Sequence, residues 1–174
     1  MRKLLILAVP LALMASPAFA QSATGTVSID GSVAGRCLFT TPSATISLGE
    51  LALGGAGGTA GKLDTTKVDG QTRTLVGWCN SSAATMTVKT TELTNVASAA
   101  TGFDNRVDYT ASAVANAATA TDSSLTPASG TASAVGLFTG NIVVTLSASS
   151  TPNSALLVAG TYTGKVEVTL SPTV

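Results

Sequence analysis

The sequence contains no histidine, and this absence removes several classes of chemistry. Ser-His-Asp and Cys-His catalysis both require an imidazole, which is also the most common metal ligand in proteins. The chain also has no nucleophile elbow, no P-loop and no dinucleotide-binding fingerprint. We therefore predict a protein that is not an enzyme and that holds no metal or cofactor.

Charged and aromatic side chains are also scarce, at 10% and 4% of the residues. Nine Lys and Arg stand against nine Asp and Glu, and loss of Arg2 and Lys3 with a leader would leave seven against nine, a net charge of −2. Nucleic acids and anionic membranes are bound by clustered basic residues, so we expect neither partner. The hydrophobic fraction, 45%, is too high for a disordered chain.

Long apolar runs are missing except at the start of the sequence. Residues 1–3 are basic at Arg2 and Lys3, residues 4–14 are apolar, and Ala18-Phe19-Ala20 matches a small-residue cleavage site. This arrangement is typical of a secretory signal peptide, and its apolar part is too short to span a bilayer. We predict a signal peptide over residues 1–20, export of the remaining chain, and no direct membrane insertion.

Cysteine occurs only twice, at Cys37 and Cys79. No histidine, third cysteine or CxxC motif accompanies this pair, so metal binding and thiol chemistry are poorly supported. In an exported chain, pairing of the two is the simplest interpretation. Such a disulfide would remove about 4 kcal/mol of unfolded-state freedom by the chain-entropy estimate.

What the chain does have is strict alternation of residue type just after the leader. Within the run of residues 21–36, positions 22–33 have small or apolar residues at every odd position and polar residues at every even one; the odd positions are Ala23, Gly25, Val27, Ile29, Gly31 and Val33. Period-2 alternation is the signature of a strand with one buried face. Such a strand can fold back onto its own domain or enter the sheet of another copy.

The rest of the chain indicates an all-β fold. Apolar residues recur at spacing two, with frequent Gly, Asn, Asp, Ser and Pro between the runs, and no helical pattern follows the leader. The glycine-rich segment 53–61 is predicted to be a loop, while residues 111–133 fit either a loop or weak edge strands. We predict an Ig-like antiparallel β-sandwich with strands near 33–39, 44–48, 72–80, 85–93, 106–109, 141–146 and 161–170.

Two features of the sequence are weak signals for a binding site, a pair of aspartates and a tryptophan. Asp104 and Asp108 could supply oxygen ligands to calcium, but acidic residues near a turn are more often solvated. Trp78 could stack on a sugar, but a tryptophan beside a cysteine in a sandwich more often packs on the disulfide in the core. We therefore predict that the two carboxylates are solvated and that Trp78 packs against the disulfide in the core.

Four stretches together resemble a known family, the subunits of chaperone-usher pili. They are residues 25–33, the Ile46-Ser47-Leu48-Gly49-Glu50-Leu51 run, the Trp78-Cys79-Asn80 triplet and the Gly160-Thr161-Tyr162 opening of the last strand. The layout is also similar to that of spore-coat-U-type secreted domains, an archaic branch.

The resemblance implies a sandwich that lacks its last strand and is completed by a neighbour's N-terminal segment. Residues 21–34 would be the donor extension and residues 35–174 the pilin-like domain. The implied donor residues are Gly25, Val27, Ile29 and Gly31, and the implied acceptor residues are Tyr162, Val166, Val168 and Leu170.

The implied function is that of a fimbrial subunit at the cell surface that supports adhesion or biofilm formation. Its implied partners are identical or related pilin subunits, together with a periplasmic chaperone and an outer-membrane usher during assembly. The alternative is a secreted single-domain sandwich, spore-coat-U-like or binding a glycan or surface, whose own N-terminal strand completes it.

Overall fold

The structure is a computed structural model that describes residues 20–173. It divides the chain into two units, residues 1–32 and residues 33–174. The predicted signal peptide lies, apart from Ala20, outside the described residues. Residues 20–36 belong to no helix or strand.

The second unit is all-β. Its elements are β1 (Cys37–Thr41), η1 (Thr65–Lys67), β2 (Thr72–Cys79), β3 (Thr85–Thr94), β4 (Phe103–Asp104), β5 (Arg106–Ala115), β6 (Ala118–Ser123), β7 (Ser133–Ala134), β8 (Phe138–Ser150), β9 (Leu156–Leu157) and β10 (Thr163–Ser171).

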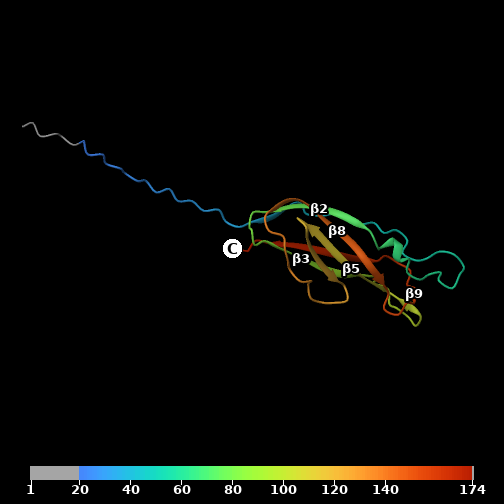
Figure 1. The fold of residues 1–174 in the computed structure, drawn as a ribbon. Helices are drawn as coiled ribbons and strands as arrows, with labels where there is room; N and C mark the ends of the chain where they lie inside the picture. Colours follow the sequence, from blue (N-terminus) through green and yellow to red (C-terminus); the bar gives the residue numbers. More distant parts are fainter. Residues whose placement is uncertain (1–19, 174) are drawn as a thin grey trace, which may run out of the picture. The chain divides into compact units, whose positions relative to one another are not determined.

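The long strands form one nearly closed antiparallel sheet (Figure 1). The strand order is β1-β2-β8-β5-β3-β10, with β6 paired to β5 and β7 paired to β3, while β4 and β9 form a separate parallel pair. β3 and β5 pair over only Leu93↔Val107 and Thr94↔Arg106. Consequently, β3 and β10 lie as a second layer over the layer that contains β2, β8 and β5.

The core lies between these layers and follows the alternation of the strands. β3 buries Met86 and Val88, β8 buries Ile142, and β5 buries Val107, all at 0% exposure. Alternate residues of each strand point to the same side, so one face of each strand enters the core. The predicted strands 72–80, 85–93, 141–146 and 161–170 correspond to β2, β3, β8 and β10.

Residues 111–133, which the sequence left open, contain regular strands in their first half. β5 runs to Ala115, a turn follows at Asn116 and Ala117, and β6 returns beside β5. The strand predicted at 106–109 is therefore the start of a ten-residue inner strand. Its core positions are Ala111, Ala113 and Ala115, whose side chains are too small to produce a clear hydrophobic pattern.

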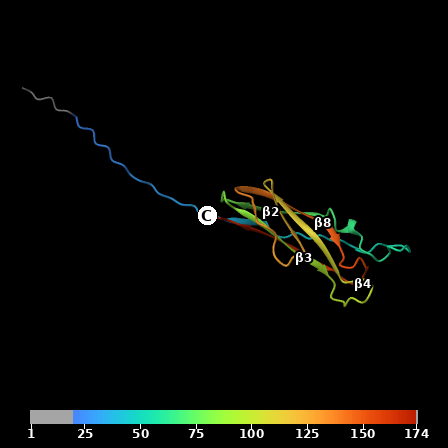
Figure 2. The ribbon, with the colours of Figure 1, turned by 60° about the horizontal axis from the view of Figure 1, so that its bottom comes forward.

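The two ends of the second unit differ (Figures 1 and 2). The C-terminus and the start of β1 lie at one end, which we call the root end, whereas β4 and β9 lie at the opposite, far end. At the root end the Ser81 hydroxyl donates to the Thr173 carbonyl. β10 therefore runs from the far end toward the root end.

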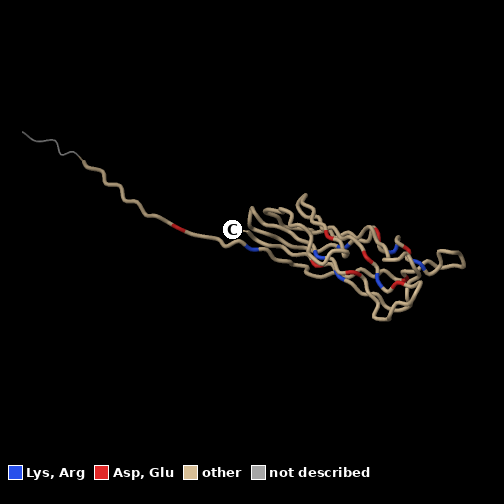
Figure 3. Tube along the Cα trace, turned by 90° about the horizontal axis from the view of Figure 1, so that it is seen from below, with Lys and Arg blue, Asp and Glu red and all other residues tan. Residues whose placement is uncertain are grey.

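Charged residues are sparse along the trace, and basic and acidic positions are intermingled in the second unit (Figure 3). Within residues 20–173 the ion pairs are Arg106 with Asp108 at 3.0 Å and Lys165 with Glu167 at 3.1 Å. None of the helices in this part of the chain has the length and hydrophobicity needed to cross a membrane.

Candidate functional site: the groove beside the last strand

A groove runs along β10, the last strand of the sheet order. Two cavities of about 640 and 590 Å³ make up this groove, and they share Ile46, Leu48, Leu93 and Gly164. One wall is residues 42–52, which we call the loop wall, and the other is formed by residues 157–169. The cavities are thus two parts of one channel between the loop wall and β10.

β10 turns an apolar face toward this groove. Val166, Val168 and Leu170 are half-buried and pack against the core, while the residues between them are exposed. On one side β10 pairs with β3 from Thr163 to Ser171, and it stands at the end of the strand order. Of the predicted acceptor residues, Tyr162 lines one cavity and Val166 and Val168 line the other, whereas Leu170 lines neither.

The strand predicted at residues 44–48, within the loop wall, does not form. Residues 42–51 are assigned to no strand, although Ile46 and Leu48 still alternate as half-buried positions between exposed ones. The segment is held by Arg73, whose Nε donates to the Thr45 carbonyl at 2.6 Å. The sequence pattern is that of a strand, but no neighbouring backbone among the described residues completes a ladder with it.

Tyr109 lies beneath the groove and ties β10 to the core. Its ring is buried, and its hydroxyl lies 2.8 Å from the Thr91 carbonyl and 3.2 Å from the Lys165 carbonyl. Burial, together with the nearby negative charge of Glu92, raises the pKa of the Tyr109 phenol to about 12. Sequence reasoning placed Tyr109 on a strand but gave no sign that its hydroxyl joins β3 to β10.

The far end of the groove is fixed by Tyr162 and Asp104. The Tyr162 hydroxyl lies 3.1 Å from the Asp104 carbonyl and 3.0 Å from the Val158 carbonyl. Burial raises the pKa of the Tyr162 phenol, which remains neutral and can donate to either carbonyl. Its ring is therefore held in place at the entrance to the groove.

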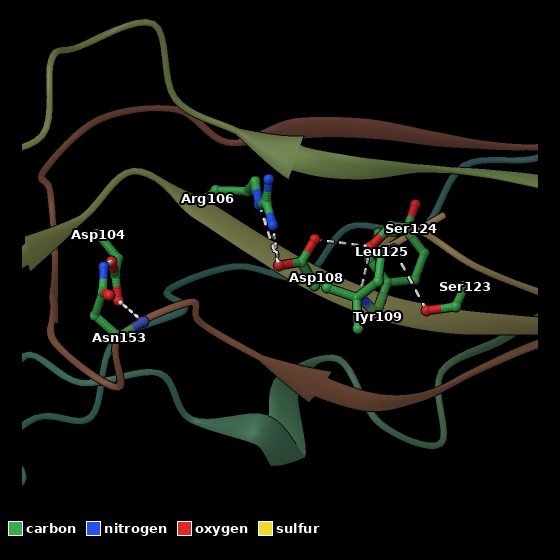
Figure 4. A network of polar contacts seen from close by, with 8 residues as sticks. All are labelled: Asp104, Arg106, Asp108, Tyr109, Ser123, Ser124, Leu125 and Asn153. Atoms are coloured by element: carbon green, nitrogen blue, oxygen red, sulfur yellow. Dashed lines mark hydrogen bonds and ion pairs between the residues drawn. The ribbon is translucent and has the colours of Figure 1, made fainter. Parts of the chain in front are cut away.

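The Asp104 carboxylate orders the loop between β8 and β9 (Figure 4). It accepts from Asn153 Nδ2 at 2.7 Å and from the backbone amides of Asn153 and Ala155 at 3.2 and 3.1 Å. Burial raises the pKa of this carboxyl, but hydrogen bonds from Asn153, Ala155 and Thr151 outweigh it, and the pKa is lowered. Asp104 is thus a buried acceptor for a loop, at 3% exposure, whereas the sequence analysis expected a solvated carboxylate.

Asp108 has a separate set of partners. It binds Arg106 Nε at 3.1 Å and the Ser124 hydroxyl at 3.1 Å (Figure 4). The two carboxylates therefore bind different segments of the chain and share no partner. Among residues 20–173, no group of three or more acidic, cysteine or histidine side chains is placed to share an ion.

The disulfide prediction is confirmed, and the prediction for Trp78 is wrong. Cys37 and Cys79 are bonded and lie opposite each other in the β1–β2 register. Trp78 pairs with Leu38 and is only half-buried. Consecutive strand residues point to opposite faces, so Trp78 lies on the other side of β2 from Cys79 and its disulfide.

The predicted donor residues are all exposed. Val27 and Ile29 are 85% and 91% exposed, and Gly25 and Gly31 have no atom within 4 Å of the position that a Cβ would take. The alternation over 21–36 thus accompanies no strand in this single chain, which is at odds with the simple strand prediction. β-structure needs a second backbone to pair with.

The start of the second unit, by contrast, is anchored. Asn80 Oδ1 accepts from the Arg36 amide at 2.5 Å, and Asn80 Nδ2 donates to the Ala34 carbonyl at 3.0 Å. The Asn80 amide also donates to the Arg36 carbonyl at 3.0 Å. Residues 34–36 therefore have a defined course into β1 at the root end.

Comparison of the chain with family models, with curated proteins and with solved structures gives no match.

Proposed function

We propose that this chain is a structural subunit of a chaperone-usher type pilus and polymerises head to tail by donating residues 21–34 to a neighbouring copy. The observation that carries the proposal is a pair of complementary features: a groove beside β10 with an apolar inner face, and an exposed segment of strict alternation. The groove is bounded by a strand with one edge free to pair, and the segment has an apolar side that nothing covers. Insertion of the segment would supply both missing contacts.

The energetics favour insertion of the segment into such a groove. Each of Val27 and Ile29 would contribute about 1.5–3 kcal/mol when buried. The strand would gain backbone hydrogen bonds with β10, and its alternating side chains would fix the register, as in other cases of β-strand addition. A copy that donates its own segment and accepts another's makes a heterologous contact that does not close, which produces a fibre.

The same features define the proposed partners and location. A strand with one unpaired edge beside an apolar groove promotes aggregation, so a subunit in transit needs a chaperone to cover that edge. The predicted signal peptide, the disulfide and the scarcity of charge are consistent with export through the periplasm by way of an outer-membrane usher. In this proposal the domain is an Ig-like sandwich that lacks one strand, and the fibre supports adhesion or biofilm formation.

The test is a pair of neighbouring substitutions in the extension of the full chain, expressed with its assembly partners. Val27→Asp would place a carboxylate in the apolar groove and should abolish fibres, because a buried unpaired charge is costly. Ser28→Asp is the matched control, since residue 28 would face outward, and it should assemble normally. Electron microscopy and a denaturant-resistant ladder on gels report assembly. Normal fibres from Val27→Asp would contradict the proposal, as would a stable monomer that buries residues 21–34 in its own groove.

A further inference from the structure

Several aspartates and asparagines of the chain stand directly before a glycine or a serine. In such a pair the backbone nitrogen of the second residue can attack the side-chain carbonyl carbon of the first, most readily before glycine, which has no Cβ to cover the nitrogen. The attack requires the side chain and the next peptide group to turn toward each other, so the surrounding structure decides which pairs react. The pairs are Asp30-Gly31, Asp69-Gly70, Asn80-Ser81, Asp122-Ser123 and Asn153-Ser154.

The Asp69-Gly70 pair is held on both sides of the reaction. Asp69 Oδ1 accepts from the Ser149 amide at 2.9 Å. The Gly70 amide donates to the Leu146 carbonyl at 2.9 Å. Both Ser149 and Leu146 belong to β8. The carboxyl and the attacking nitrogen are therefore each bound to the same strand, and they meet only if hydrogen bonds break.

The three pairs that end in serine are held at their first residue. In each of them the side chain of the aspartate or asparagine is bound to another segment of the chain, which keeps its carbonyl carbon away from the next backbone nitrogen. These bonds join Asn80 to the Ala34 carbonyl, Asp122 to the Thr90 amide and Asn153 to the Asp104 carboxylate, at 3.0, 2.6 and 2.7 Å.

Asp30-Gly31 has no such restraint. Both residues are exposed and belong to no helix or strand. No atom lies within 4 Å of the position that a Cβ on Gly31 would take. Among residues 20–173, the Asp30 carboxylate and the Gly31 amide take part in none of the hydrogen bonds or ion pairs. This pair thus combines the most reactive type of sequence with free rotation about its backbone.

We propose that Asp30-Gly31 is a site of spontaneous isomerisation, at which an unpaired chain converts aspartate to isoaspartate. After the Asp30 carboxylate takes a proton from water, the Gly31 nitrogen bonds to Cγ, and the amide proton leaves with the carboxyl OH as water. Water then opens the resulting five-membered imide. Cleavage between the nitrogen and Cγ restores aspartate, whereas cleavage between the nitrogen and the α-carbonyl carbon gives isoaspartate. The mass of the chain is unchanged, and no other reactant is consumed.

Isoaspartate would interrupt the alternation of the extension. The main chain would then run through Cβ and Cγ of residue 30, which places one extra backbone atom between Ile29 and Gly31. Period-2 alternation depends on an equal backbone spacing at every residue. An extra element in one strand disrupts the ladder locally, as a β-bulge does. The apolar side formed by Val27 and Ile29 would therefore no longer be in phase with Gly31.

The consequence for assembly rests on the proposed function. A strand that is paired in a ladder has an extended backbone, and its amides are held by the neighbouring strand. Donation of residues 21–34 would therefore keep the Asp30 carboxyl and the Gly31 nitrogen apart. Chains that wait unassembled would accumulate isoaspartate and lose the ability to donate, whereas chains within a fibre would be protected.

The test is isoaspartate mapping of the exported full chain after prolonged warm incubation at neutral pH. Labelling with a protein-isoaspartate methyltransferase, followed by mass spectrometry of peptides, gives the isomerised fraction at each aspartate. The fraction at Asp30 should be several-fold larger than at Asp69, which is the control within the same chain. Gly31→Ala should lower the fraction at Asp30 several-fold, because a methyl group then covers the nitrogen. Ser28→Ala, also in the extension, should leave it unchanged.

A fraction at Asp30 no larger than at Asp69 overturns this inference and leaves the pilus proposal in place. Fibres kept under the same conditions should contain several-fold less isoaspartate at Asp30 than unassembled chains. Equal fractions in fibres and in unassembled chains would show that residue 30 stays unpaired in the fibre. That result contradicts donation of residues 21–34, while the isomerisation site itself stands.

Discussion

Residues 21–33 and β10 have almost the same sequence pattern but very different structures. Both alternate small or apolar residues with polar ones over about ten positions, as period-2 strands do. β10 pairs along its length with β3 and half-buries Val166 and Val168, whereas Val27 and Ile29 are 85% and 91% exposed. Alternation thus encodes which face of a strand is apolar, and a partner backbone decides whether the strand forms.

The loop wall is an intermediate case. Residues 44–48 alternate and keep Ile46 and Leu48 half-buried, yet they form no ladder. Packing against the core therefore suffices to hold an extended segment, and a ladder requires hydrogen-bonding neighbours as well. The following predictions test this three-way comparison.

The largest effect is expected from loss of the disulfide, which anchors β1 directly after residues 34–36. The Cys37→Ser/Cys79→Ser variant should lose about 4 kcal/mol of unfolding free energy by the chain-entropy estimate. Amide exchange over residues 22–32 should stay fast in both proteins, because that segment is unpaired in the single chain. Denaturant titration measures the unfolding free energy of the two proteins. A loss below about 1 kcal/mol, outside the usual range for such bonds, would contradict it.

The second prediction compares the two alternating segments directly. Val168→Asp introduces a carboxylate on the inner face of β10 and should destabilise the monomeric domain by about 2–3 kcal/mol, because the charge loses water without gaining a partner. Val27→Asp should leave the stability of the same monomer unchanged, since its side chain is already exposed. Thermal unfolding of both variants provides the measurement. Equal destabilisation by the two would show that the extension is folded into its own domain.

The third prediction concerns the tie between β10 and the core. Tyr109→Phe removes the hydroxyl shared by the Thr91 and Lys165 carbonyls and should cost about 1–2 kcal/mol. The folded-state pKa, about 12, lies above the ordinary value of 10.0, so the stability from the neutral phenol is complete below pH 10 and is lost as the pH rises toward 12. Unfolding followed from pH 9 upward should show this loss in the parent chain and a smaller loss in Tyr109→Phe. If the unfolding free energies of the parent chain and Tyr109→Phe fell in parallel with pH, the Tyr109 hydroxyl would not hold β10 to the core.

The smallest effect is expected at a turn away from the groove. Ala117 has φ of 63° in the turn between β5 and β6, a conformation that costs a non-glycine residue energy. Ala117→Gly should stabilise the domain by about 0.5–1 kcal/mol. Ala118→Gly, in the adjoining strand, is the matched control and should destabilise it. Neither change should alter fibre assembly. An effect on assembly would show that the turn between β5 and β6 takes part in contacts between copies.

Much of this architecture could be predicted from the residues, and the failures have separate causes. The strands at 72–80, 85–93 and 141–146 were predicted because Val, Ile, Met and Leu mark their core faces. Residues 111–115 of β5 and all of β6 were not predicted as strands, because their core positions are alanines, which are too small to stand out as an apolar face. Trp78 was misplaced because its neighbour Cys79 suggested the core, although adjacent strand residues face opposite ways.

Local alternation and the number of cysteines were enough to predict the all-β class, the disulfide pair, the apolar face of the last strand and the apolar side of the extension. The local pattern did not predict that β10 borders a groove, or that the Tyr109 and Tyr162 hydroxyls bind backbone carbonyls beside it. Those features arise where segments distant in the chain meet, and the spacing between such segments depends on packing that local patterns do not encode.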